Sequence, residues 1–288
     1  MLIECLNSIA KIGTPTGAEV LVTVVDNDQF RSMEPVVVGM RDSFPFPLFY
    51  HCEKKRGIPC ARNRSIDETL VLDCQYLVFI DDDEWVERDW LSQLYCYGKS
   101  RGEVIVSGSV ISELPDGTPD HIYGLFNTRQ RKTGVRLSSC ATNNVLIPVS
   151  IIKQHHLRFD ETDPLAGGTD TIFFCGAVKA GVDIFKCAEA KVHETVPKSR
   201  IALKWLAKRK YRVGITAAWR KQQEGRSKIN IAGSSIFQIF SEFCKAGTFM
   251  LLGKKVERNE SLLKACRSAG ILSGIFGKKV DSYKKIDN

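Results

Sequence analysis

The sequence predicts an α/β protein in which a mostly parallel sheet is covered by helices on both faces, with a basic helical region at the C-terminal end. Two observations predict the α/β part. Short apolar runs alternate with segments of helical periodicity, and two of these runs end in acidic clusters. A third observation predicts the helical region, because after Lys198 the chain becomes basic and helical in pattern, with glycines at intervals.

The order of the elements follows from the spacing of apolar residues. Leu2, Leu6 and Ile9 recur at helical spacing, whereas residues 20–25 (VLVTVV) and 76–80 (YLVFI) are continuous runs that are typical of buried strands. The predicted elements are, in order, a helix over 2–11, a strand over 20–25, a strand near Phe49, a helix over 57–70, a strand over 76–80, a helix from Trp90 and a strand over 104–106.

Length and composition limit the possible classes of protein. The 288 residues, 43% hydrophobic and 26% charged, suit one large domain and a smaller appendage, which we place at residues 1–198 and 199–288. The ten cysteines include no C-x-x-C pair, so their spacing indicates neither a zinc site nor a disulfide framework. Glu242 and Lys245 interrupt the longest apolar stretch, at 231–253, so we expect no membrane span.

The net charge of +8 is divided unevenly along the chain. Residues 197–288 hold 21 Lys/Arg and 6 Asp/Glu, a net charge of +15, whereas the preceding residues hold 20 and 27, a net charge of −7. A basic region of this kind suits phospholipid headgroups or a phosphorylated acceptor. No nucleic-acid-binding motif accompanies it, so we expect no nucleic-acid partner. Four aromatic residues are candidates for contact with a membrane interface, or for packing against the first domain: Trp205, Trp219, Phe237 and Phe240.

The strand over 76–80 ends in Asp81, Asp82, Asp83 and Glu84. Adjacent like charges are costly unless a cation lies among them, and hard divalent cations prefer oxygen ligands. Asp81 and Asp83 are able to face the same way and to hold Mg²⁺ or Mn²⁺ against a diphosphate. The alternative is a solvated acidic turn that caps the helix beginning near Trp90. The position after a buried strand favours the metal site.

Residues 79–84 (FIDDDE), which follow residues 57–63 (GIPCARN), resemble the central signature of glycosyltransferase family 2. Within that family the chain resembles the branch that acts in exopolysaccharide and lipooligosaccharide assembly. The resemblance extends from residue 2 to about residue 215. Further matches keep the order of the family: residues 142–147 (TNNVLI) resemble its acceptor-side strand, 159–161 (FDE) with 167–170 (GGTD) a segment that usually ends in Glu-Asp, and 192–197 (VHETVP) with Arg200 its closing loop.

This resemblance implies a GT-A fold, the Rossmann-like fold of nucleotide-diphospho-sugar transferases. It also implies an inverting transfer of a hexose from a nucleoside diphosphate sugar, most simply a UDP-sugar, to a hydroxyl of a surface glycan or lipid-linked acceptor. The implied cofactor is Mg²⁺ or Mn²⁺. Free cysteines and the absence of a leader pattern indicate the cytoplasm. The basic region would hold the enzyme at the inner face of the membrane.

The resemblance also implies roles for acidic residues. Asp170 matches the general base that deprotonates the acceptor, although Thr169 replaces the Glu of the usual pair; the alternative is that Asp170 caps the following helix. Asp26 matches the residue that reads the nucleotide base, with Asp28 also on the donor side; the alternative is an Asx-turn at the strand end. Asp82 is assigned to the donor with these residues.

The remaining assignments concern cations and a histidine. Arg62 matches a position near the nucleotide and diphosphate, and the alternative is a surface helix charge. His193 matches a third metal ligand beside Asp81 and Asp83, although a lone histidine is as often structural. Lys198 and Arg200 either contact the diphosphate or lie in the closing loop.

The sequence departs from the family pattern at its start. Family members begin with a central strand and a turn that contacts the nucleoside, before the helix that starts here at Leu2. Without that strand, two neighbouring strands lose a partner. Either Met1 is an internal methionine or the gene is truncated; we favour the former, because the later motifs are largely intact. Two other functions stay open: an inactive remnant or binding protein, and a nucleotidyltransferase, which normally has a Gly-rich loop near its amino terminus.

Overall fold

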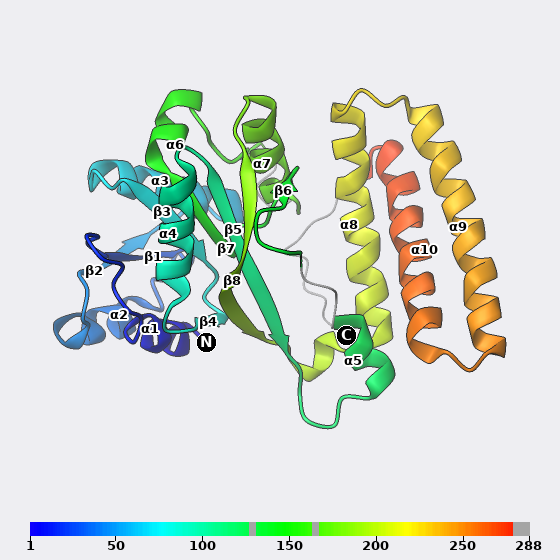
Figure 1. The fold of residues 1–288 in the computed structure, drawn as a ribbon, viewed down its shortest axis with the longest axis horizontal. Helices are drawn as coiled ribbons and strands as arrows, with labels where there is room; N and C mark the ends of the chain where they lie inside the picture. The colour runs from blue at the N-terminus through cyan, green and yellow to red at the C-terminus, as the bar shows by residue number, and fades with distance from the viewer. Residues whose placement is uncertain (127–130, 163–166, 279–288) are drawn as a thin grey trace. The chain divides into compact units, whose positions relative to one another are not determined.

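The computed structural model describes residues 1–126, 131–162 and 167–278 (Figure 1). It divides into two compact units. The first comprises Met1–Ile111, Gln130–Leu165 and Thr169–Glu194, and the second comprises Ser112–Arg129, Ala166–Gly168 and Thr195–Asn288.

The first unit alternates strands and helices, as the sequence predicts. Its elements are α1 (Leu2–Ile9), β1 (Val22–Asp26), α2 (Glu34–Met40), η1 (Arg41–Ser43), β2 (Leu48–Cys52), α3 (Ile58–Val71), β3 (Tyr76–Ile80), β4 (Glu84–Val86), α4 (Trp90–Arg101), β5 (Ile105–Glu113), β6 (Arg136–Leu137), β7 (Asn144–Pro148), α6 (Val149–His155), α7 (Thr169–Lys179) and β8 (Ile184–Thr195). Each element predicted from periodicity is confirmed, and each starts within two residues of its predicted start. β5 extends to Glu113, beyond its predicted end at residue 106. The α/β fold class is confirmed as well.

Strand direction differs from the mostly parallel sheet that the sequence predicts. β1 and β2 are parallel, with Val22 opposite Leu48. The second sheet has the order β3-β7-β5-β8-β4, with β6 paired to β8. Its pairs β3–β7, β5–β7, β4–β8 and β6–β8 are antiparallel. All five residues of β7 are buried. A strand buried on both faces has the same apolar composition in either direction, so its sequence does not reveal which way it runs.

The strand order is interrupted between β1 and β3. Within the described ranges β1 pairs with β2, β3 pairs with β7, and no strand joins β1 to β3. All five residues of β1 are half-exposed, although four of them are Val or Thr. This is the pairing expected of two strands that lack a shared neighbour.

Helices cover both faces of the larger sheet. Ile105 and Ile147 point to one face, where they pack with Ile66 of α3, with α6 and with Phe174 of α7. The alternate strand residues, including Leu146, point to the other face and pack with α1 and α4. This alternation buries the sheet on both sides and leaves the ends of its strands as the place where polar residues gather.

The second unit contains α5 (Asp120–Phe126), η2 (Lys198–Arg200), α8 (Leu203–Gln223), α9 (Lys228–Leu251) and α10 (Lys255–Ile275). α10 packs along both α8 and α9, and Figure 1 shows the three helices side by side. No helix in the described part of the chain combines the length and apolar content that a bilayer span requires.

Glycines allow the close approach of α8 and α10, and this packing yields a prediction. A Cβ at Gly214 would lie 2.0 Å from the carbonyl oxygen of Arg267 and 2.9 Å from Cα of Gly270. We therefore expect Gly214→Ala to lower the free energy of unfolding by about 1–3 kcal/mol, in spite of the better helix propensity of alanine. Denaturant unfolding followed by circular dichroism measures the change.

The matched control is Gly233→Ala in α9, where a Cβ would meet no atom within 4 Å. This substitution removes a glycine from a helix interior without a clash, so we expect it to stabilise the protein by about 0.5–1 kcal/mol. Equal effects at Gly214 and Gly233 would contradict the close packing.

Candidate active site

The candidate active site lies in the first unit, where β1 and β3 end. Asp26 is the last residue of β1, and Asp81 follows the last residue of β3 directly. The start of α3, which carries Arg62, and the start of α7, which carries Asp170, supply the other charged groups. Ligands of α/β sheets bind at the carboxyl ends of strands, so the acidic clusters occupy the expected edge.

Asp170 is held by groups from two other segments. One carboxylate oxygen pairs with the guanidinium of Arg62, and the other accepts hydrogen bonds from the backbone N–H of Thr142 at 3.2 Å and from its hydroxyl at 3.1 Å. The side chain is 24% exposed, so the carboxylate is fixed in position and reachable from solvent. These bonds run to α3 and to the segment before β7, which makes Asp170 more than a cap for α7.

Arg62 links Asp170 to the acidic cluster. Its Nη2 atom lies 3.9 Å from Oδ1 of Asp81, and its guanidinium lies 5.6 Å from the centre of the Phe159 ring. The side chain is 14% exposed, so the alternative of a solvated surface charge does not describe it. The guanidinium between the two carboxylates offsets part of their mutual repulsion.

The pKa of Asp81 is raised to about 6. Desolvation of the carboxylate is the main cause, although the side chain is 48% exposed. The charge of Arg62 opposes the rise in pKa, and the charges of Asp170, Asp83 and Asp82 add to it. A carboxyl that is costly to ionise alone is one that gains from a nearby cation.

Glu84 has a role in the site that the sequence did not predict. It is 2% exposed, accepts a hydrogen bond of 2.7 Å from the Asn143 side chain and one of 3.2 Å from the backbone N–H of Asp81. Burial, then the charge of Asp81, raises the pKa of Glu84 to about 8. Glu84 therefore holds the acidic turn in place through its hydrogen bonds to Asp81 and Asn143. The one feature of the sequence that pointed to Glu84 was its place at the end of the acidic run.

The acidic residues fit a divalent cation in their chemistry. Asp81 and Asp83 supply carboxylate oxygens, and Mg²⁺ commonly binds through one or two carboxylates together with substrate phosphates and water. The described residues contain no group of three or more His, Cys, Asp or Glu side chains that is able to hold a metal by itself. A metal held by Asp81 and Asp83 would have further positions for diphosphate oxygens and water.

His193 lies in strand β8, although the family resemblance placed it in a closing loop. Its ring stacks on Trp85 at 3.9 Å between centroids, and its Nε2 atom lies 3.1 Å from Oε1 of Glu87. Antiparallel pairing with β4 holds this part of the chain as a strand. The structure therefore gives His193 structural contacts, and metal binding by this residue stays a prediction.

The end of β1 forms a tightly bonded turn. The Asp26 carboxylate accepts hydrogen bonds from the Tyr50 hydroxyl at 2.8 Å and from the backbone N–H of Asp28 at 2.9 Å. The second bond is the Asx-turn that the sequence left as an alternative. The Asp28 pKa is lowered by the backbone N–H of Phe30 and the hydroxyl of Ser32. Carboxylate oxygens have several acceptor positions, so the turn leaves room for a further donor.

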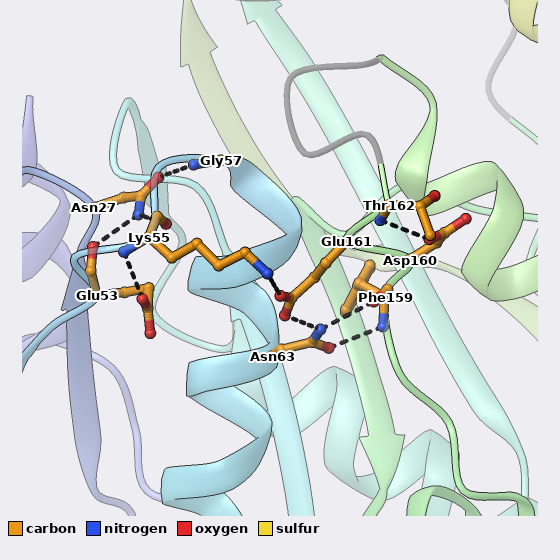
Figure 2. Close-up of polar contacts among 9 residues, drawn as sticks. All are labelled: Asn27, Glu53, Lys55, Gly57, Asn63, Phe159, Asp160, Glu161 and Thr162. Carbon is orange, nitrogen blue, oxygen red and sulfur yellow. Dashed lines mark hydrogen bonds and ion pairs between the residues drawn. The ribbon is translucent and has the colours of Figure 1, made fainter.

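Two asparagines that the sequence analysis did not single out tie the loops of the site together (Figure 2). The Asn27 side chain donates to the carbonyl oxygens of Glu53 and Lys55 and accepts from the N–H of Gly57, at 2.7–2.9 Å. It thereby fixes the loop that leads into α3. Asn27 lies between the candidate residues Asp26 and Asp28. This position was the sequence feature that could have identified it.

Asn63, in α3, fixes a second segment of the site through its side-chain hydrogen bonds. Its side chain donates to the Phe159 carbonyl oxygen and the Glu161 carboxylate, and it accepts from the N–H of Phe159 (Figure 2). Lys55 pairs with the same carboxylate, and Asn63 and Lys55 together lower the pKa of Glu161. These bonds fix residues 159–161, which include Phe159, the residue whose ring lies against Arg62.

Lys198 and Arg200 belong to the second unit, in η2. Lys198 is exposed, and the Arg200 guanidinium lies 5.9 Å from the Trp205 ring centre. Their contact with a diphosphate stays a prediction.

Known proteins resemble this chain in sequence. The family model described as Glycosyl transferase family 2 matches residues 1–155. The succinoglycan biosynthesis protein ExoM of Rhizobium meliloti (strain 1021) is 31% identical over 286 residues, which cover 98% of this chain and 91% of that protein.

Solved structures of other proteins share the fold. The crystal structure of S. aureus TarS 1–349 in complex with UDP-GlcNAc has a TM-score of 0.54 at 14% identity, over 94% of this chain and 86% of that chain. GalNAc-T7 with UDP, GalNAc and Mn²⁺ has a TM-score of 0.53 at 14% identity, over 78% of this chain and 48% of that one. At these identities the likeness concerns the fold alone.

Proposed function

The chain belongs to glycosyl transferase family 2, and from that premise we propose an inverting hexosyltransferase that uses a UDP-sugar. The acceptor is a hydroxyl of a surface glycan or of a lipid-linked glycan. The name of the relative, succinoglycan biosynthesis protein, supports the acceptor class, and the UDP bound in two structural neighbours supports the donor class.

The observation that carries the proposal is the placement of Asp170 by Arg62 and Thr142 beside the acidic end of β3. In the proposed reaction Asp170 accepts the proton of the acceptor hydroxyl. The acceptor oxygen then attacks the anomeric carbon as the bond to the UDP oxygen breaks, and a single displacement inverts the configuration. The hydrogen bonds from Thr142 orient the carboxylate.

The donor lies along the acidic edge in this proposal. Asp26 and Asp28 bind the nucleoside side, and Asp82 lies beside the sugar. Asp81 and Asp83 would hold Mg²⁺ or Mn²⁺, with His193 as a further ligand, and the cation would neutralise charge on the departing diphosphate. Lys198 and Arg200 are assigned to diphosphate oxygens.

We place the catalytic domain at residues 1–198 and the basic helical region at 199–288. The net charge of +15 over residues 197–288 supports a cytoplasmic protein that is peripheral at the inner membrane face.

The interrupted sheet favours a second candidate, an inactive remnant or a binding protein. The unpaired edges of β1 and β3 flank the proposed donor site within the described residues. Such a protein would release no sugar from a UDP-sugar.

Donor turnover tests the proposal. The folded chain is incubated with Mn²⁺ and UDP-glucose, UDP-galactose or UDP-GlcNAc. Release of the nucleoside diphosphate is measured, with ADP-glucose as the donor control and EDTA as the metal control. We expect Mn²⁺-dependent release from at least one UDP-sugar and none from ADP-glucose. UDP binding without release supports the second candidate, and the absence of both binding and release opposes the donor proposal.

A further inference from the structure

Helix α9 buries small and polar residues and exposes large apolar ones. The residues that it buries include Ser235, Glu242 and Ala246, at 1%, 5% and 6% exposure, together with Ile231. A helix on the surface of a soluble protein normally buries its large apolar residues and exposes its polar ones. Here the small and polar residues contact the bundle, so the large apolar residues are on the outside.

The exposed apolar residues form one continuous face. Ile229, Ile236, Phe240, Phe243 and Met250 recur at intervals of three, four or seven, which places them along one side of the helix over about 30 Å. Phe237 and Leu251 lie beside them. We call these seven residues the α9 apolar face, and they are all between 56% and 90% exposed. Soluble monomers rarely expose apolar surface of this extent without a partner for it.

The charges around this face are mainly positive. Residues 225–255 hold five Lys/Arg and one Asp/Glu. The single acid, Glu242, is buried and pairs with Lys245 at 2.8 Å. The exposed cations Arg226, which pairs with Glu224 at 3.5 Å, and Lys228 lie where α9 begins. Lys254 and Lys255 lie just after it ends. An apolar stripe with cations at both ends fits anionic headgroups above acyl chains.

The helix fits a position along the membrane surface. No described helix is able to span a bilayer, and the inner side of α9 is occupied by its packing on α10. Of the four aromatic residues singled out from the sequence, Phe237 and Phe240 are 73% and 70% exposed, whereas Trp205 and Trp219 are half-buried.

We propose that the α9 apolar face is a membrane-docking surface that lies in the headgroup region of a bilayer containing anionic phospholipid. This inference deepens the membrane association of the proposed function by naming the surface that makes it. A second copy of the chain would suit the apolar residues, but five cations and one buried acid oppose the pairing of two identical faces.

Vesicle co-sedimentation tests the inference. The full chain is mixed, without donor, with phosphatidylcholine vesicles that contain 30% phosphatidylglycerol. The triple variant Phe237→Ser/Phe240→Ser/Phe243→Ser is compared with the matched control Val38→Ser/Val71→Ser/Val135→Ser, whose residues are also exposed. Circular dichroism confirms that each variant is folded.

We expect the wild type to bind, high salt to weaken binding, and the triple variant to lower the partition coefficient at least about tenfold, with no change in the control. Equal binding by the triple variant would overturn the proposal. So would light scattering that shows a wild-type dimer, a monomeric triple variant and no vesicle binding by either. Because no donor is present, loss of vesicle binding is distinguishable from loss of transferase activity.

Discussion

Replacement of Asp170 by asparagine is expected to slow sugar transfer by about 10²–10⁴-fold, the usual contribution of a positioned general base. Asparagine has the same size and its oxygen is able to accept the hydrogen bonds from Thr142, but the amide cannot take the proton of the acceptor. UDP affinity should change little. Initial rates of transfer and calorimetric titration of UDP measure the two effects separately.

Asp160→Asn is the matched control for this substitution. Asp160 accepts a hydrogen bond from the N–H of Thr162, and the pKa of Asp160 is lowered by that bond and by the Thr162 hydroxyl. It has no part in the proposed reaction, so its variant should retain wild-type rates. A folded Asp170→Asn protein that is as active as Asp160→Asn would remove Asp170 from the role of base.

Replacement of Arg62 by methionine is expected to lower kcat/KM by about 10–100-fold, which corresponds to the loss of one hydrogen bond to a charged group. Without the guanidinium, Asp170 and Asp81 lose the cation between them, and their mutual repulsion opposes further negative charge from a diphosphate. Methionine keeps an apolar stem against the Phe159 ring. Steady-state rates at several donor concentrations measure kcat and KM.

Arg158→Met provides the comparison for Arg62. Arg158 also pairs with an aspartate, Asp67, but its side chain is 45% exposed and that of Asp67 is 53% exposed. Exposed ion pairs contribute little, so activity and stability should stay close to wild type. Similar losses in both variants would show that Arg62 acts through general stability and has no specific role at the site.

Much of the first unit could be predicted because its early elements are local in origin. The run over 76–80 matches β3, and the helix from Trp90 matches α4. β8 was missed because residues 184–195 mix charged and apolar positions, and its stability comes from distant strands. The antiparallel direction of β7 was not predicted. All five residues of the strand are buried, so it lacks the alternation of apolar and polar residues that is typical of antiparallel strands.

The site residues were predictable where the residue type and its place in the chain together indicate a function. Carboxylates after a buried strand pointed to the acidic edge, and the family resemblance pointed to Asp170 and Arg62, which the structure brings into contact. The tasks of Asn63 and Glu84 were not predictable, because they depend on partners about 60–100 residues away in the chain. The stacking of His193 on Trp85 depends likewise on the β4–β8 register.

Calorimetric titration of UDP in the presence of Mn²⁺, on the wild-type chain and on Asp83→Ala, tests the central claim most directly. The account predicts UDP binding that requires Mn²⁺ and is lost in Asp83→Ala while the fold is retained. Binding that is equal with Mn²⁺ and with EDTA, or equal in the two proteins, would contradict a metal-assisted donor site at the end of β3.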